Sequence, residues 1–419
     1  MAGVTSAGAL RQGAWGLTDQ VVYSLTNFAL SVLVARSVTQ QEFGAFSVIF
    51  VAYVFVQGVL EAVVAEPLTV SYSATPRKGA AAPLGDAAGC VVGAGIGLGV
   101  VILALSRLTS GAVGGVLPVF AVVLPGLLLQ NLWRFAFFAT GRPRAAVGND
   151  LVWAGAQIMA IVGLIVAGKA SLNLLVLAWG GAGTVAAVVG MLQAGVVPRP
   201  LRSGRWLAGH GSLSSRFTGE FVALYGSAYL VQAMVGGFSG LAELAKLRGA
   251  LVVFAPLNGL LNGLRIAVTP LGVRVQARAP GRLPALAVRL SLAVGAVALA
   301  WSAAALLLPT GLGEALLGDT WKGAREVVPA IAVTVVAAGL SVGAFTGLRA
   351  MVAARRSLRA RGAIAVLSLV LGGAGAVLGN AAAAAAGLGL ASMVGVVLMW
   401  LQYRLAVADQ QRVDQSAGS

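Results

Sequence analysis

Polar side chains follow one face of the first apolar segment, residues 14–36. Four of them are spaced as one helical face requires, at Gln20, Ser24, Asn27 and Ser31. Asp19 and Tyr23 flank this stripe. Polar groups in hydrocarbon are costly and therefore face a protein interior or a water-filled cavity. We interpret the stripe as the wall of a hydrophilic pathway; the alternative is hydrogen bonding between helices, worth about 0.6 kcal/mol per contact.

Two charged residues lie inside other apolar segments, Glu61 in 44–66 and Arg265 in 249–271. An arginine within a span costs roughly 2.5–3.5 kcal/mol unless it pairs or reaches the interface. Our hypothesis is a cavity between two halves of the chain, in which Arg265 binds an anionic headgroup. Glu61 or Asp19 would then respond to a proton or a cation. The alternative is a structural ion pair or a set of interface anchors.

The elements that must position these residues are transmembrane helices. Hydrophobic residues make up 58% of the 419 residues and charged residues only 10%, whereas a soluble domain carries about 25% charged residues. Apolar runs near 20 residues, the length that spans the hydrocarbon core, recur along the chain. They predict an all-α polytopic membrane protein with twelve spans: 14–36, 44–66, 84–106, 112–138, 149–168, 172–194, 218–238, 249–271, 286–308, 328–350, 362–381 and 386–406.

The basic residues predict the orientation of these spans. With the N-terminus inside, 21 lysines and arginines fall on the cytoplasmic side, 7 fall outside and Arg265 falls within a span. This excess predicts that both termini are cytoplasmic. The resulting domains are an N-terminal six-helix bundle at 1–195, a cytoplasmic linker at 196–217, a C-terminal six-helix bundle at 218–406 and a cytoplasmic tail at 407–419.

Short matches between the halves suggest an internal duplication. Arg134 near the end of span four precedes Arg142, and Arg349 near the end of span ten precedes Arg356. Six spans per half would relate the bundles by a pseudo-two-fold axis along the membrane normal. We interpret these arginines and the other basic clusters mainly as topology signals that contact lipid headgroups.

Several function classes are disfavoured. The net charge of +16 is spread over short gaps between spans, which does not suggest nucleic-acid binding. A single cysteine, Cys90, and a single histidine, His210, exclude an intramolecular disulfide and a His-rich metal site. No phosphate-cradling G-x-x-x-x-G-K-[ST] loop is present. No outer loop carries the catalytic groups expected of a membrane glycan polymerase or ligase, so we do not expect an enzyme.

Two stretches carry a family resemblance. The first runs from Asp19-Gln20 through Asn27-Phe28 and Ala35-Arg36 to Glu42-Phe43-Gly44, and the second joins Arg134 to Thr140-Gly141-Arg142-Pro143. They resemble polysaccharide flippases of the MOP exporter superfamily, a group that includes O-antigen flippases, the lipid II flippase and MATE drug antiporters. The motif match covers roughly 1–75 and 130–150, whereas the match in length and number of spans covers the whole chain.

The resemblance implies a transporter of the bacterial plasma membrane. It would flip an undecaprenyl-pyrophosphate-linked oligosaccharide to the outer leaflet by alternating access. It would need no cofactor and could couple to a proton or sodium gradient. Its partners would be that substrate, membrane lipids and glycosyltransferases or the polymerase of the same pathway, without nucleic acid. A MATE-type antiporter of the same fold is the main alternative. The loop Ser73–Gly79 lacks the pattern typical of major-facilitator transporters, and a membrane scaffold would not need the polar stripe.

Overall fold

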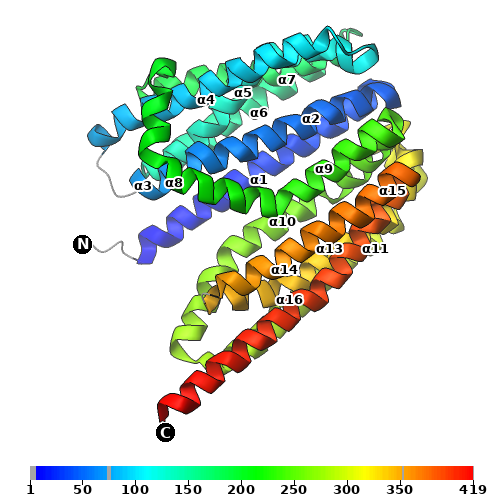
Figure 1. Cartoon of the computed structure of the whole chain (residues 1–419). Helices are drawn as coiled ribbons and strands as arrows, with labels where there is room; N and C mark the ends of the chain where they lie inside the picture. Colours follow the sequence, from blue (N-terminus) through cyan, green and yellow to red (C-terminus); the bar gives the residue numbers. More distant parts are fainter. Residues whose placement is uncertain (1–5, 73–76, 352, 419) are drawn as a thin grey trace. The chain divides into compact units, whose positions relative to one another are not determined.

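The chain folds into two compact helical units, unit 1 at Met1–Val222 and unit 2 at Ala223–Ser419. The computed structural model describes the backbone of residues 6–72, 77–351 and 353–418 (Figure 1). Within these ranges every regular element is helical, and eleven helices are long and apolar enough to cross a membrane. The prediction of an all-α polytopic membrane protein is therefore confirmed.

Unit 1 is built around one central helix, α5 (Gly111–Ala139), which packs mainly against four other helices. These neighbours are α2 (Gln40–Leu60), α4 (Arg77–Ser106), α6 (Pro143–Val166) and α7 (Leu172–Ala194). The first helix, α1 (Ser6–Ser37), packs mainly on α6. Bulky side chains fill the space between them, and Trp133, Trp153 and Trp179 are fully buried. The centre of unit 1 is thus densely packed.

Each of the two stretches that carry the family resemblance contains a helix boundary. Thr39 begins α2 with a capping box, because its side chain accepts the Glu42 backbone N–H while the Glu42 carboxylate accepts the Thr39 N–H. Between α5 and α6, Gly141 has a φ of +69°, a left-handed conformation that favours glycine. Pro143 then occupies the first turn of α6, where its missing N–H is not needed.

Replacing Thr39 with alanine is expected to lower the free energy of unfolding of the detergent-purified protein by about 1 kcal/mol, because the α2 N-terminus loses its cap. Chemical denaturation followed by tryptophan fluorescence measures this change. Thr39→Ser keeps the capping oxygen and should stay near the wild type. An equal loss in both variants would contradict the assignment of the cap.

The second span contains a π-helical turn, η1 (Glu61–Ala65), between α2 and α3 (Glu66–Tyr72). Pro67 explains why regular hydrogen bonding fails here, since it has no N–H for the Val63 carbonyl four residues earlier. The Ser214 hydroxyl donates to that carbonyl at 2.7 Å. Ser214 lies on α8 (Ser203–Phe221), which follows the short 3₁₀ turn η2 (Pro200–Arg202). The residues predicted as a linker therefore form part of unit 1.

Unit 2 is organised around α13 (Thr320–Ala350), which packs against α10 (Leu241–Arg278), α11 (Leu283–Leu306) and α16 (Ala381–Gly418). Its remaining helical segments are η3 (Val222–Gly226), α9 (Ser227–Met234), η4 (Val235–Ser239), η5 (Pro280–Arg282), α12 (Thr310–Leu317), α14 (Ala354–Leu367), η6 (Ser368–Gly372) and α15 (Gly373–Leu378). The α11–α13 contact uses small residues: Gly295 lies against Gly339, and the Gly343 N–H donates to the Ser291 hydroxyl at 3.0 Å. Small residues allow helices to approach closely in lipid.

Eleven of the twelve predicted spans coincide with the eleven apolar helices, with shifted boundaries. The remaining one, 218–238, falls on the end of α8, η3, α9 and η4, of which η3 and η4 are π-helical turns. The break between the last two spans, predicted between 381 and 386, lies at Gly379-Asn380, where the Glu243 carboxylate accepts the Ala381 N–H.

Several predicted span boundaries were wrong by more than five residues, among them the starts of α10 and α13. The helix α10 begins at Leu241 rather than at 249, because Gly240, with a φ of +97°, sets the turn that precedes it. Lys246 and Arg248, which we expected in an outer loop, therefore lie within α10.

Candidate functional site

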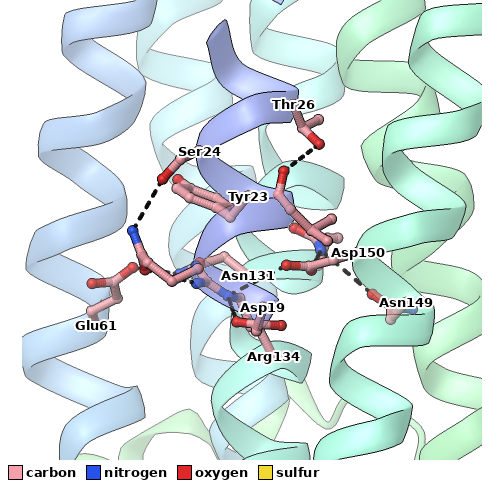
Figure 2. Close-up of polar contacts among 12 residues, drawn as sticks. Asp19, Tyr23, Ser24, Thr26, Glu61, Asn131, Arg134, Asn149 and Asp150 are labelled. Carbon is pink, nitrogen blue, oxygen red and sulfur yellow. Dashed lines mark hydrogen bonds and ion pairs between the residues drawn. The ribbon is translucent and has the colours of Figure 1, made fainter. Parts of the chain in front are cut away.

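Polar side chains from four membrane-spanning segments meet inside unit 1, and we call this group the unit 1 polar cluster (Figure 2). Its members are Asp19, Gln20, Tyr23 and Ser24 of α1, Gln57 of α2, Glu61 of η1, Gln130, Asn131 and Arg134 of α5, and Asn149 and Asp150 of α6. Spacings of four residues, as in Gln57/Glu61 and Gln130/Arg134, place the members of each helix on the same face. Helical spacing on α1, α2, α5 and α6 thus directs these groups to one location.

The guanidinium of Arg134 lies at the centre of the cluster. Its Nε is 2.5 Å from Asp19 Oδ2 and 3.4 Å from Asp150 Oδ2. Its terminal nitrogen donates to Gln20 Oε1 at 3.3 Å, and its carbon lies 4.2 Å from the centroid of the Tyr23 ring. The Arg134 side chain is 13% exposed, and those of Asp19 and Asp150 are 3% and 1% exposed. One buried guanidinium therefore bridges two buried carboxylates.

Glu61 belongs to a second arm of the cluster. Its Oε1 accepts hydrogen bonds from Gln57 at 2.8 Å and from Asn131 at 2.9 Å. The Gln57 side-chain amide also lies within hydrogen-bond distance of the Tyr23 hydroxyl, whose ring faces Arg134. A chain of polar contacts thus connects the Glu61 carboxylate to Arg134.

A third arm holds Asp150 in place. Gln130 donates to Asp150 Oδ1 at 2.8 Å, and the neighbouring Asn149 donates to the Ala186 carbonyl of α7 at 2.8 Å. Asn149 and Asp150 are 0% and 1% exposed. These contacts fix the carboxylate that faces Arg134 opposite Asp19.

The charges of the cluster do not balance when every group is ionised. Asp19, Asp150 and Glu61 would contribute three negative charges and Arg134 one positive charge. A net charge of about −2 among buried and partly buried groups carries a desolvation cost. The oxygens Asp19 Oδ1 and Asn27 Oδ1 are also buried and make no hydrogen bond. Taking up protons or a cation would lower this cost.

The structure brings most of the predicted site residues together, with different roles. Asp19, Gln20, Tyr23, Ser24 and Glu61 belong to the unit 1 polar cluster. At the far end of the stripe, Asn27 Nδ2 and Ser31 Oγ donate hydrogen bonds to backbone carbonyls one turn earlier in α1. These two donors therefore find acceptors within α1 itself. Arg265 lies in α10, but its side chain falls outside the described residues, and its role stays a prediction.

Sequence reasoning missed the centre of the site. We interpreted Arg134 as a topology signal, whereas its side chain is paired with carboxylates inside unit 1. Asp150 was not singled out, although it is a lone carboxylate at the beginning of an apolar span. That position is a usable signal, because intramembrane carboxylates generally have a partner. Gln57 and Asn131 gave no comparable signal.

Arg248 in unit 2 is a second cation within an apolar helix that sequence reasoning misplaced. It lies on α10, and its side chain is partly buried. Among the described residues, no group of three or more histidines, cysteines or carboxylates could hold a metal ion.

Comparisons with known proteins agree on the fold. No family model matches the chain, and neither does any curated protein sequence. Among solved structures, the lipid II flippase MurJ in an inward closed conformation superposes with a TM-score of 0.68 at 12% identity, covering 93% of this chain and 87% of that one. An inward-facing MATE multidrug transporter gives 0.70 at 14% identity, covering 93% and 95%. A MOP superfamily transporter from Pyrococcus furiosus gives 0.63 at 13% identity, covering 95% of each chain. The chain therefore has the fold of MOP superfamily transporters.

Proposed function

We infer that the protein is a membrane transporter whose unit 1 polar cluster binds the coupling ion. The observation that carries this proposal is the placement of one guanidinium between two buried carboxylates, with a third carboxylate connected to them. A packing role alone would not require more negative than positive groups in an apolar interior. Sites of this composition take up and release positive charge in proton relays of membrane transporters.

The geometry favours a proton over sodium as the coupling ion. Arg134 Nε contacts both Asp19 Oδ2 and Asp150 Oδ2, so the guanidinium occupies the space where a sodium ion would bridge the two carboxylates. A proton binds to one oxygen and needs no coordination shell. Protonation of Asp19 or Asp150 would weaken the ion pair of that carboxylate with Arg134 and make the guanidinium available to another anion.

The proposed substrate is a lipid-linked oligosaccharide, flipped towards the outer leaflet of a bacterial plasma membrane with both termini cytoplasmic. The resemblance of the two sequence stretches and the shared fold support it. Arginine suits a pyrophosphate because its planar fork donates two parallel hydrogen bonds. Arg134, when released from the two carboxylates, is the candidate for that contact. The excess of basic residues in the segments predicted to be cytoplasmic supports the orientation.

Transport in proteoliposomes tests the proposal. The full-length protein is reconstituted with a fluorescent undecaprenyl-pyrophosphate-linked sugar, and the outer-leaflet fraction is measured by dithionite quenching. A pH gradient should drive net movement, and a sodium gradient at constant pH should not. Asp19→Asn and Asp150→Asn should each abolish the gradient-driven part, because each removes a protonatable carboxylate beside Arg134.

Glu314→Gln in α12 is the matched control and should leave transport unchanged, since it removes a carboxylate outside the cluster. Transport that survives in the double variant Asp19→Asn/Asp150→Asn would refute the role of the cluster. Movement of ethidium but not of the labelled lipid, driven by the same pH gradient, would favour the MATE-type antiporter instead. That fold is shared with the multidrug transporter described above.

A further inference from the structure

One face of the helix α8 carries the side chains that contact the second span. These side chains are spaced by four, four and seven residues, as one face of a helix requires: Trp206, His210, Ser214 and Phe221. The rings of Trp206 and His210 stack with their centroids 4.0 Å apart. Their centroids lie 6.2 and 5.8 Å from that of Tyr72, the last residue of α3. The beginning of α8 therefore packs on the end of the second span.

Two further contacts of this face lie on either side of Glu61 in the sequence of the second span. Two residues after Glu61, the Val63 carbonyl accepts a hydrogen bond from Ser214 Oγ at 2.7 Å. Three residues before Glu61, Gly58 lies so close to Phe221 that an added Cβ would collide with the phenyl ring. The Ser214 side chain is buried. The helix α8 therefore contacts the backbone of the second span immediately before and after this carboxylate.

Glu61 begins a turn whose shape depends on more than the hydrogen bonds of its own helix. In η1 the Glu66 N–H donates to the Glu61 carbonyl five residues earlier, as in a π-helix. Pro67 has no N–H to donate to Val63, and Ser214 supplies a hydrogen bond to that carbonyl instead. Without this donor the turn would have to rearrange, because an unpaired carbonyl in a membrane-spanning segment is costly. Adding or removing one residue in a helical turn rotates the flanking side chains relative to each other by about 100°.

The partners of Glu61 make its position sensitive to such a rotation. Its Oε1 accepts hydrogen bonds from Gln57 at 2.8 Å and from Asn131 at 2.9 Å. Gln57 lies one turn earlier on α2, whereas Asn131 comes from α5. The bond to Asn131 therefore depends on the rotation of the second span about its own axis. Part of a 100° rotation would carry the carboxylate away from α5.

We propose that Ser214 is a positioning residue for Glu61. Its hydrogen bond to Val63 holds η1 in the form that turns the carboxylate towards its partners on α2 and α5. The contact of Phe221 with Gly58 keeps α8 in place on the other side of Glu61. The position of Glu61 is thus set by a helix that contributes no side chain to the unit 1 polar cluster. The consequence for transport rests on the proposed function, whereas the positioning itself does not.

Chemical labelling of Glu61 tests the positioning. The detergent-purified full-length protein is treated with dicyclohexylcarbodiimide, which reacts with carboxyl groups in apolar surroundings, and labelling of Glu61 is followed over time by peptide mass spectrometry. Ser214→Ala should raise the labelling rate about fivefold, because the carboxylate is no longer held by its hydrogen bonds and becomes accessible to the reagent. Ser214→Thr keeps the hydroxyl and should restore the wild-type rate.

Ser215→Ala is the matched control, because it removes a hydroxyl from the next, exposed position of α8, where the donor serves the Ser212 carbonyl of the same helix. It should be labelled at the wild-type rate. Phe221→Ala keeps the Ser214 hydroxyl and should also raise the rate, which provides a second test if Ser214→Ala does not fold. Wild-type labelling in both Ser214→Ala and Phe221→Ala, or equal acceleration in Ser215→Ala, overturns the positioning role.

The proteoliposome assay separates this inference from the proposed function. Ser214→Ala should lower gradient-driven transport and Ser214→Thr should restore it, since only the threonine can donate to Val63. Faster labelling of Glu61 together with undiminished transport would support the positioning role and contradict a part for Glu61 in ion coupling. Unchanged labelling overturns the positioning role whatever the transport rate.

Discussion

Replacing Arg134 with glutamine is expected to lower the free energy of unfolding by about 3–5 kcal/mol, the usual cost of removing one partner of a buried ion pair. The substitution leaves Asp19 and Asp150 facing each other with their side chains 3% and 1% exposed and no cation between them. Thermal or chemical unfolding of the detergent-purified protein measures the loss. Gradient-driven transport should also disappear.

A second substitution separates charge from packing. In Arg134→Gln/Asp150→Asn one carboxylate is removed together with the guanidinium, so much of the lost stability should return while transport stays absent. The conservative variant Arg134→Lys keeps the charge but loses the contact of Nε with both carboxylates, and should be intermediate. A wild-type unfolding midpoint for Arg134→Gln would show that the cluster contributes nothing to stability.

Gly343→Ala is expected to destabilise unit 2 by about 1–3 kcal/mol, although a single methyl group is added. A Cβ at this position would meet the backbone carbonyl of Ala287 on α11, which cannot move aside as a flexible side chain can. The helices α11 and α13 would have to separate, and the bond from Gly343 N–H to Ser291 would lengthen. The unfolding midpoint of the purified protein reports the change.

Gly362→Ala provides the matched control, since no atom lies within 4 Å of its added Cβ. Alanine is favoured over glycine within a helix by about 0.5–1 kcal/mol, so this variant should be as stable as the wild type or slightly more stable. A loss in Gly362→Ala equal to that in Gly343→Ala would mean that helix propensity, and not the α11–α13 approach, controls the effect.

The helical architecture could be predicted from the sequence because hydrophobic length is a local property. A largely apolar run of 23 residues such as 172–194 has few alternatives to a membrane helix, and the structure places α7 at Leu172–Ala194. The predicted start of α10 was wrong because the backbone conformation of a single residue sets this helix end. The start of α10 depends on the conformation of Gly240, and an average over apolar residues does not report one backbone angle.

The candidate site was predicted on α1 and at Glu61 of η1, and its members on α2, α5 and α6 were missed. Periodicity along α1 pointed to Gln20 and Ser24, since residues on one helix have a fixed spacing. Arg134 and Asp19 are 115 positions apart in the sequence, and only tertiary packing joins them. Arg134 also resembled the basic residues that mark the cytoplasmic side, so charge alone could not distinguish an ion pair from a topology signal.

The proline in the second span has a consequence for how this chain can be recombined. Pro67 leaves the Val63 carbonyl without its usual donor, and a hydroxyl 151 positions later supplies one. The Val63 carbonyl of span two therefore receives its hydrogen bond from Ser214 of α8, and α8 contributes to the structure of unit 1. In a chimaera of related chains, residues 196–222 should therefore come from the same parent as the N-terminal half. A crossover placed before residue 196 would take Val63 and its described side-chain donor, Ser214, from different parents.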